Sequence, residues 1–188
     1  MIRDYLLHLY PELTFGQDGE AADCVLRDDG AGPYIAAWNR PEPQPTPEQI
    51  AAAMLPAAQA QMASRIRADC ERRQFTEGVP FGGVRWQSDE KSRGRYAMLQ
   101  GFATLALMQG ATMESPVADP STGQTVNWNA MGGVSVPLTV GLLLGMLQAA
   151  AARENACDTR YRQHVAALNE LTDPAAVLAY DFSTGWPA

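Results

Sequence analysis

Hydrophobic and polar positions in the first forty residues predict a short helix followed by a β-hairpin. Apolar residues within 2–10 recur at helical spacing, and Pro11 ends that segment because proline cannot continue a helix. Two apolar runs, at 24–26 and 34–38, flank the sequence Asp28-Asp29-Gly30. Aspartate and glycine are residues that tight turns favour, so we expect the two runs to pair as strands.

The next segment combines a proline-rich stretch with the start of a long helix. Four of the seven residues 41–47 are proline, which favours an extended, semi-rigid linker. Thr46 and Gln49 have the spacing of a capping box, in which the side chain of each residue bonds the backbone amide of the other. We therefore predict a helix over 48–74, with a kink or break at Pro56.

This helix carries a thin apolar stripe that suits packing against another helix. The stripe repeats at spacings of four and three residues and consists of Ala51, Leu55, Ala58, Met62 and Ile66. Such a stripe fits a helix of the same chain and a helix of a symmetry-related copy equally well. The sequence leaves both alternatives open.

Beyond residue 75 the pattern predicts short strands between helices. A glycine-rich stretch contains one strand candidate, at 84–86. Ser88 is expected to cap a helix that runs to Gly110. Two further strands are predicted at 125–128 and 134–136, with a turn between them.

A long helix is predicted from residue 137 or 138 to about residue 169. Its stripe alternates spacings of four and three, is interrupted by an arginine, and comprises Met146, Ala150, Arg153, Cys157, Tyr161, His164, Leu168 and Leu171. The place of His164 on this stripe favours a packed or interface histidine over a ligand or a pH switch. A short helix should follow Thr172 or Asp173, and Trp186 is expected to fold back onto its own domain or a neighbour.

Together these elements predict a helix-dominated α+β fold. An N-terminal helix and β-hairpin module is followed by a Pro-rich linker, a long helix, and C-terminal helices packed on a small antiparallel sheet. The expected boundaries are 1–40 for the N-terminal module, 41–47 for the linker, 48–74 for the connecting helix and 75–188 for the C-terminal domain.

Composition and charge narrow the function further. The chain has 188 residues, a hydrophobic fraction of 46% and a formal net charge of −7. We therefore expect a packed core. We expect no nucleic-acid partner, since affinity for nucleic acids comes largely from Lys and Arg side chains on phosphates.

The three cysteines form no Cys-x-x-Cys pair and the two histidines lie far from them in sequence. We expect no metal, no cofactor and no disulfide framework. Residues 130–152 lack charge but are rich in Ala and Gly, which favours a buried or oligomer-facing helix over a membrane span.

No catalytic constellation stands out in the sequence. The Asp28-Asp29-Gly30 run lacks the order of a calcium loop, the glycines of 78–83 are not followed by Lys-Ser or Lys-Thr, and no Gly-x-Ser-x-Gly elbow occurs. We therefore expect no enzymatic activity. The candidate functional residues are instead those expected at interfaces, namely Tyr34, Trp38, Leu55, Met62, Ile66, Cys157, Tyr161, His164, Leu168 and Trp186.

Two stretches of the sequence resemble proteins of tailed phages. The first is carried by residues 9–11, by the run 25–39 with its Asp-Gly-x-Gly-Pro-Tyr-Ile-Ala-x-Trp-Asn core, and by the proline-rich stretch to Gln49. It resembles a small N-terminal module of tail-fibre components and tail assembly chaperones. From residue 73 to the end, the chain resembles a domain of unknown function of phage and prophage tail proteins. The residues that carry the second resemblance are Gly83 to Asp89, Arg93, Trp128, Val134 to Pro137, Gln163-His164 and Asp181 to Pro187.

The resemblance implies a structural component of a phage tail or baseplate, an adaptor that attaches or supports tail fibres or a receptor-binding protein. Its partners would be other tail, baseplate or tail-fibre proteins. A homo-oligomer is expected, with a trimer favoured because tail fibres are trimeric in related phages. The protein would reside in the virion tail, and in the host cytoplasm during assembly. The alternative is a tail or tail-fibre assembly chaperone that the virion does not retain.

Overall fold

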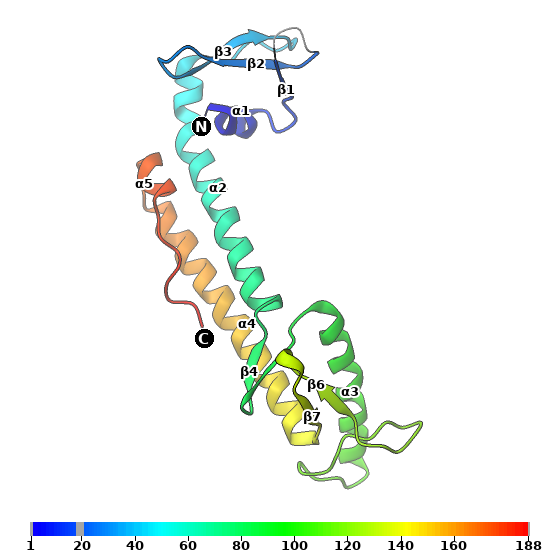
Figure 1. The fold of residues 1–188 in the computed structure, drawn as a ribbon. Helices are drawn as coiled ribbons and strands as arrows, with labels where there is room; N and C mark the ends of the chain where they lie inside the picture. The colour runs from blue at the N-terminus through cyan, green and yellow to red at the C-terminus, as the bar shows by residue number, and fades with distance from the viewer. Residues whose placement is uncertain (1, 18–20, 188) are drawn as a thin grey trace. The chain divides into compact units, whose positions relative to one another are not determined.

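The structure of the chain, a computed structural model, describes residues 2–17 and 21–187 (Figure 1). Among the described residues, 51% lie in helices and 16% in strands, which confirms the predicted helix-dominated α+β fold. The helices are α1 (Ile2–Leu9), α2 (Pro47–Phe75), α3 (Glu90–Met108), α4 (Val140–Asn169) and α5 (Pro174–Leu178). The strands are β1 (Phe15–Gly16), β2 (Cys24–Asp28), β3 (Pro33–Trp38), β4 (Val79–Phe81), β5 (Val84–Trp86), β6 (Asn127–Asn129) and β7 (Ser135–Pro137), with a short 3-10 helix η1 at Met131–Gly133.

Contacts group the chain into two compact units. Unit 1 comprises Met1–Ser64 and Ala166–Tyr180, and unit 2 comprises Arg65–Val165 and Asp181–Ala188. The helices α2 and α4 each contribute residues to both units. Because this grouping follows contacts rather than independent folding, the sequence-based domain boundaries stay a prediction.

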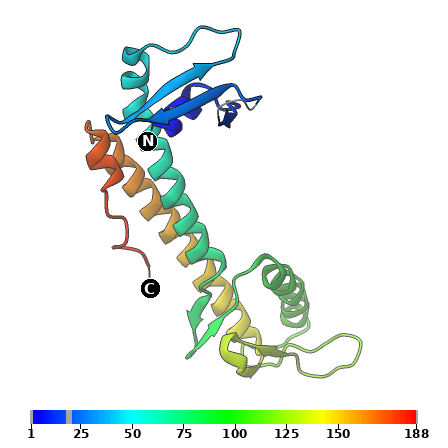
Figure 2. The same ribbon diagram turned by 45° about the horizontal axis from the view of Figure 1, so that its top comes forward.

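Unit 1 contains a small sheet of three strands in the order β1-β2-β3 (Figure 2). β2 and β3 are antiparallel, as predicted, and β1 adds a short parallel pair that the sequence pattern did not indicate. At the hairpin turn, the Asp28 carboxylate accepts hydrogen bonds from the amides of Gly30 and Gly32 at 2.9 and 3.2 Å. Gly30 has a φ of +95°, which residues with a Cβ rarely adopt. The core of unit 1 includes Tyr5, Leu6, Leu13, Cys24, Ala53 and Ala57.

The proline-rich segment ends in the predicted capping box. The Thr46 amide donates to the side-chain oxygen of Gln49 at 2.8 Å, and the Gln49 amide donates to the Thr46 hydroxyl at 3.2 Å. Pro47 takes the first helical position, where a missing N–H leaves no bond unmade. Helix α2 continues through Pro56, so the break considered there does not occur. Pro56 is exposed, and water can therefore hydrate the carbonyl that its missing N–H leaves unpaired.

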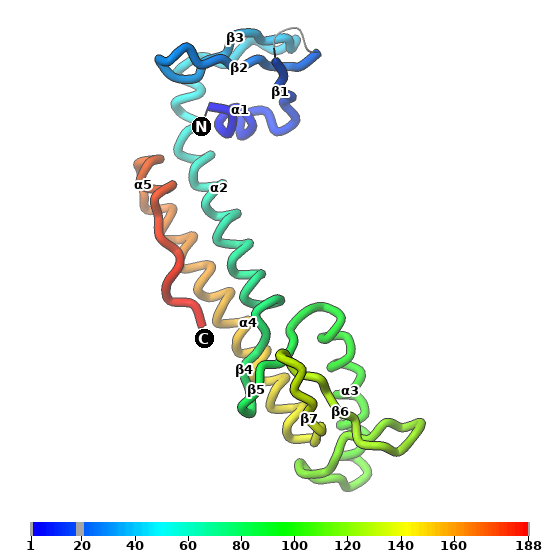
Figure 3. Tube along the Cα trace, in the orientation of Figure 1, coloured from blue at the N-terminus to red at the C-terminus, as the bar shows by residue number. Residues whose placement is uncertain are grey.

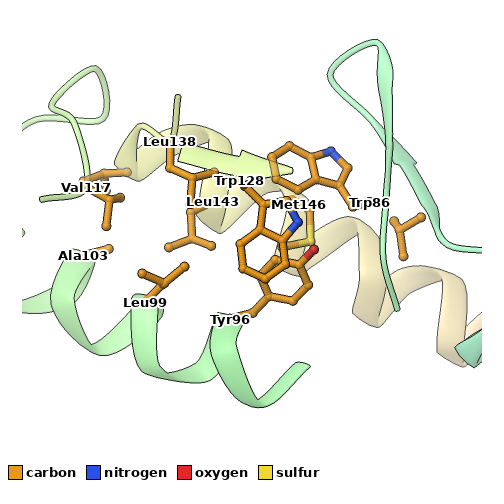
Figure 4. Close-up of a cluster of buried hydrophobic side chains, with 11 residues drawn as sticks. Trp86, Tyr96, Leu99, Ala103, Val117, Trp128, Leu138, Leu143 and Met146 are labelled. Atoms are coloured by element: carbon orange, nitrogen blue, oxygen red, sulfur yellow. The ribbon is translucent and has the colours of Figure 1, made fainter. Parts of the chain in front are cut away.

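Unit 2 packs α3 and two β-hairpins against α4. β4 pairs antiparallel with β5, and β6 pairs antiparallel with β7. Their apolar side chains meet in one core, into which Tyr96, Leu99 and Ala103 point from α3 (Figure 4). The ring centroids of Tyr96 and Trp128 lie 4.2 Å apart. The other buried members are Val79, Trp86, Val117, Leu138, Val140, Leu143 and Met146.

The structure corrects one predicted helix cap and confirms another. Asp89, not Ser88, caps α3, because its carboxylate accepts a hydrogen bond from the Ser92 amide at 3.0 Å. Ser88 is buried instead, with 4% of its surface exposed. Asp173, one of the two residues predicted to start the short last helix, caps α5.

The strand prediction for unit 2 was incomplete. The pattern missed β4, whose central residue is Pro80, a residue that ordinarily argues against a strand. Pro137 ends β7, so α4 begins at Val140 rather than at 137 or 138. Neither difference alters the fold class.

Replacement of Thr46 by alanine should lower the free energy of unfolding by about 1 kcal/mol, because it removes the hydroxyl that accepts the Gln49 amide. Chemical denaturation of the purified protein measures this change. Thr159→Ala, at an exposed position of α4, is the matched control and should change stability by less than about 0.5 kcal/mol. Equal losses in the two variants would contradict the capping role.

Candidate interaction surfaces

An apolar groove of about 360 Å³ opens on unit 1. Its walls come from α1, β3, the proline-rich segment and the first turns of α2. We call it the N-terminal groove and define it by its lining residues, Ile2, Pro33, Tyr34, Ile35, Gln44, Pro45, Pro47, Ile50, Ala51 and Met54. Most of these side chains are aliphatic or proline, so the groove suits the apolar side chains of another segment rather than a charged ligand.

Strand β3 borders this groove and lies at the edge of its sheet. It pairs with β2 on one side, and no strand among the described residues pairs with its other side. An edge strand presents backbone N–H and C=O groups to which a further strand can bond. The groove and the edge together therefore suit an extended peptide with alternating apolar side chains.

Of the two aromatic candidates from the N-terminal module, Tyr34 lines the groove and Trp38 supports the fold. The Tyr34 hydroxyl donates to the Asp29 carboxylate at 2.6 Å, and the residue remains 41% exposed. The Trp38 Nε1 donates to the Glu42 carbonyl at 2.7 Å, and its ring meets the ring of Tyr10 edge-on with centroids 5.3 Å apart. Trp38 thereby holds the start of the proline-rich segment against the sheet.

The candidate stripe residues of unit 1 are covered by their own chain. Met62 and Leu168 are each 1% exposed, and Leu55 is half-buried. The Gln59 side-chain amide donates to the carbonyls of Leu168 and Leu171 at 3.3 and 3.4 Å, at the end of α4. Packing within the chain accounts for this part of the stripe, and a role between copies stays a prediction.

The stripe residues of unit 2 are covered in the same way. Ile66 and Cys157 are fully buried, and the half-buried Tyr161 lies under the Arg67 guanidinium, 4.8 Å from the ring centroid. Burial raises the pKa of the neighbouring Cys70 thiol to about 11 and also raises the pKa of Cys157. Both thiols are therefore protonated at neutral pH, which removes the nucleophilic form.

A buried arginine joins α4 to the end of α2 and to the C-terminal tail. Arg153 is 7% exposed. Its Nη2 lies 3.1 Å from the Glu77 carboxylate and donates to the Arg73 carbonyl at 3.3 Å. Its Nη1 donates to the Pro187 carbonyl at 3.3 Å. The arginine that interrupts the predicted stripe is thus a central polar contact of unit 2.

The tail returns along α4 (Figure 3). The Trp186 ring packs on His164 there. Their ring centroids lie 5.3 Å apart, and the Trp186 Nε1 donates to the Phe182 carbonyl at 2.7 Å. The Arg160 guanidinium donates to the Thr184 carbonyl at 3.2 and 3.0 Å. The tail therefore folds back onto its own chain, which was one of the two expected alternatives.

His164 is 2% exposed, and this burial lowers its pKa below the ordinary value of 6.5. The positive charge of Arg160 lowers this pKa further, while a hydrogen bond with the Thr184 backbone and the carboxylates of Asp181 and Asp69 oppose the shift. The imidazole is therefore neutral at pH 7 and behaves as a packed aromatic side chain.

The described part of the chain contains no group of three or more His, Cys, Asp or Glu side chains able to hold a metal ion. None of the helices in the described ranges combines the length and the apolar character needed to span a bilayer.

Sequence reasoning missed the N-terminal groove because it assigned residues 41–47 to a linker. The segment lies within unit 1, where Pro45 is buried and forms part of the groove wall. Ile50 and Met54 on the first turns of α2 supply the other wall. Their spacing of four residues is visible in the sequence, but nothing there indicates that prolines lie opposite them.

Comparison with protein families gives two matches. Residues 57–184 match a domain of unknown function, DUF4376, and residues 2–63 match the XkdW protein family. XkdW is a phage-associated family of the Bacillus phage PBSX kind, so this match suggests a phage protein. The comparison with curated proteins found no match, and the comparison with solved structures found none either.

Acidification from pH 7.5 to pH 5.5 should reduce stability through His164. The folded state binds a proton at His164 less readily than the unfolded chain, so stability is lost as the pH falls through the unfolded value near 6.5. In His164→Phe this part of the pH dependence should disappear from the midpoint of thermal unfolding. His8→Asn, in the exposed histidine of α1, is the control and should keep the wild-type pH dependence. A wild-type slope in His164→Phe would contradict the assignment.

Proposed function

We propose that this chain, which belongs to the DUF4376 family, is a structural component of a phage tail or baseplate. In this role it is an adaptor that attaches or supports tail fibres or a receptor-binding protein. The observation that carries the proposal is that the family match and the N-terminal groove occupy the same part of the chain. The phage-associated XkdW match covers residues 2–63, and every residue that lines the N-terminal groove lies within that segment.

The groove supports an adaptor role because it combines two modes of contact. Apolar side chains of a partner segment gain free energy when they leave water for a preformed groove. The free edge of β3 can add backbone hydrogen bonds that fix the direction and register of that segment. The proposed occupant is therefore an extended, apolar stretch of another tail, baseplate or fibre protein.

The proposal assigns no catalysis and no cofactor to the protein. The protein would act in the virion tail after assembly in the host cytoplasm, as one copy of a homo-oligomer. The net charge of −7 argues against DNA as its partner, because an acidic chain is repelled by phosphates.

Ala51→Arg should impair this role and leave the fold intact. Ala51 is exposed on α2 and lines the groove, so an arginine there places a charge where an apolar partner would dock. A lysogen that lacks the gene, complemented in trans, should release about tenfold fewer infectious particles with Ala51→Arg than with wild type.

Ala60→Arg is the matched control, because Ala60 is an exposed residue of the same helix outside the groove. Its particle yield should equal that of the wild type, and both variants should unfold at the wild-type temperature. Equal yields from Ala51→Arg and Ala60→Arg would refute the groove as the docking site.

An assembly chaperone absent from the finished virion is the second candidate, and the exposed apolar groove favours it as well, since such a surface can cover a client. Coexpression should then raise the soluble yield of the phage's fibre protein, and Ala51→Arg should abolish the gain. A yield that does not respond to coexpression would count against the chaperone.

A further inference from the structure

Helix α3 carries a second apolar face that its own domain does not cover. Tyr96, Leu99 and Ala103 point into the core of unit 2 (Figure 4). On the other side of the helix, Met98 is 55% exposed, Leu105 53% and Met108 81%. Ten large hydrophobic residues are exposed in the described part of the chain, and four of them, Leu107 included, lie on α3. This concentration on one helix marks a contact surface rather than scattered exposure.

The exposed face has the spacing of a coiled-coil seam. Its residues alternate spacings of four and three, which keeps them on one line of the helix surface. They are Gly94, Met98, Gly101, Leu105 and Met108. We call this line the α3 seam. The two glycines are exposed, and a Cβ added to either would meet nothing within 4 Å. The glycines are therefore open notches between large side chains, and packing inside the chain does not require them.

We propose that the α3 seam binds the α3 seam of a second copy of this chain in antiparallel orientation. Coiled-coil layers in an antiparallel pair set each a position against a d position of the partner. The register that places Met98 over Gly101 of the second copy also places Leu105 over Gly94. Every such layer then joins one large side chain to one glycine notch, and two-fold symmetry repeats each contact.

The distribution of charge selects the same orientation. The charged residues between Lys91 and Met108 are Lys91, Arg93 and Arg95, all near the start of the helix. A parallel pair would bring the basic starts of both helices together, whereas an antiparallel pair separates them. In the antiparallel register, Lys91 lies against Met108 of the second copy. There its aliphatic stem covers the methionine and its charge meets the negative end of the helix dipole.

The kind of occupant, a helix of a second copy, also follows from the spacing of the seam. The notches accept slender aliphatic side chains at a repeat of three and four residues, which only a helix supplies. The chain itself offers a helix with large residues in the matching positions, and residues 96–108 contain no charge that would oppose it. This pairing is two-fold, so the proposal predicts a dimer at this surface, whereas the trimer expected from the resemblance stays an untested alternative.

The test begins with sedimentation equilibrium of the full-length protein. Wild type should sediment as a dimer. Gly94→Leu/Gly101→Leu should weaken dimerisation by at least about tenfold, because leucine fills both notches. The same double variant should unfold at an equal or higher temperature as a monomer, since leucine favours a helix more than glycine does and the added Cβ meets no atom within 4 Å. A variant that loses dimerisation but keeps or gains thermal stability shows that the two glycines serve the contact between copies and not the fold of the chain.

Ala152→Leu, an added leucine at an exposed position of α4, is the matched control and should remain dimeric. Orientation is tested by cysteine cross-linking, which the native cysteines do not disturb because all three are buried. An oxidised mixture of Gly94→Cys and Leu105→Cys should form a mixed disulfide dimer, whereas Leu105→Cys alone should not. A monomeric or trimeric wild type, a dimer that survives Gly94→Leu/Gly101→Leu, or a cross-linked Leu105→Cys homodimer would overturn the proposal.

Discussion

The buried guanidinium of Arg153 is the interaction on which the organisation of unit 2 depends. A charge that is 7% exposed must be paired and hydrogen-bonded, or its removal from water would cost several kcal/mol. Its partners are the Glu77 carboxylate and the carbonyls of Arg73 and Pro187. These groups come from the end of α2, from the segment that leads into β4, and from the C-terminal tail. One side chain of α4 therefore fixes two segments that are distant from it in sequence, residues 73–77 and the C-terminal tail.

Similar side-chain contacts lie behind the two proposed contact surfaces, the N-terminal groove and the α3 seam. Arg153 and Arg160 hold the tail, and Trp186 covers His164 on α4. The core of unit 2 uses one face of α3 and leaves the α3 seam outside. In unit 1, Trp38 holds the start of the proline-rich segment, whose residues Gln44, Pro45 and Pro47 line the N-terminal groove. Both proposed contact surfaces thus lie on helices or strands whose opposite faces pack against their own unit, as precise docking requires.

The sequence predicted those features that depend on neighbouring residues. The capping box at Thr46, the Asp-Gly turn of the hairpin and the Asp173 cap each involve groups a few positions apart, and the structure contains all three. Two other features were missed for different reasons. β4 was hidden by Pro80, and the groove was hidden because a proline-rich run was interpreted as a spacer. The stripes of α2 and α4 were found, but a heptad has the same form whether its partner belongs to the same chain or to another copy. Only the burial of Ile66 and Cys157 shows that the chain itself covers them.

The proposed phage protein holds other proteins through one groove for a partner segment and one seam for a second copy. In this role it would remain in the finished particle. Quantitative mass spectrometry of purified virions, with the major tail-tube protein as internal standard, measures whether it does. We expect the protein to be present at a small, fixed number of copies per particle. Its absence from particles, together with abundance in the lysate, would contradict the structural role and leave assembly as the step in which it acts.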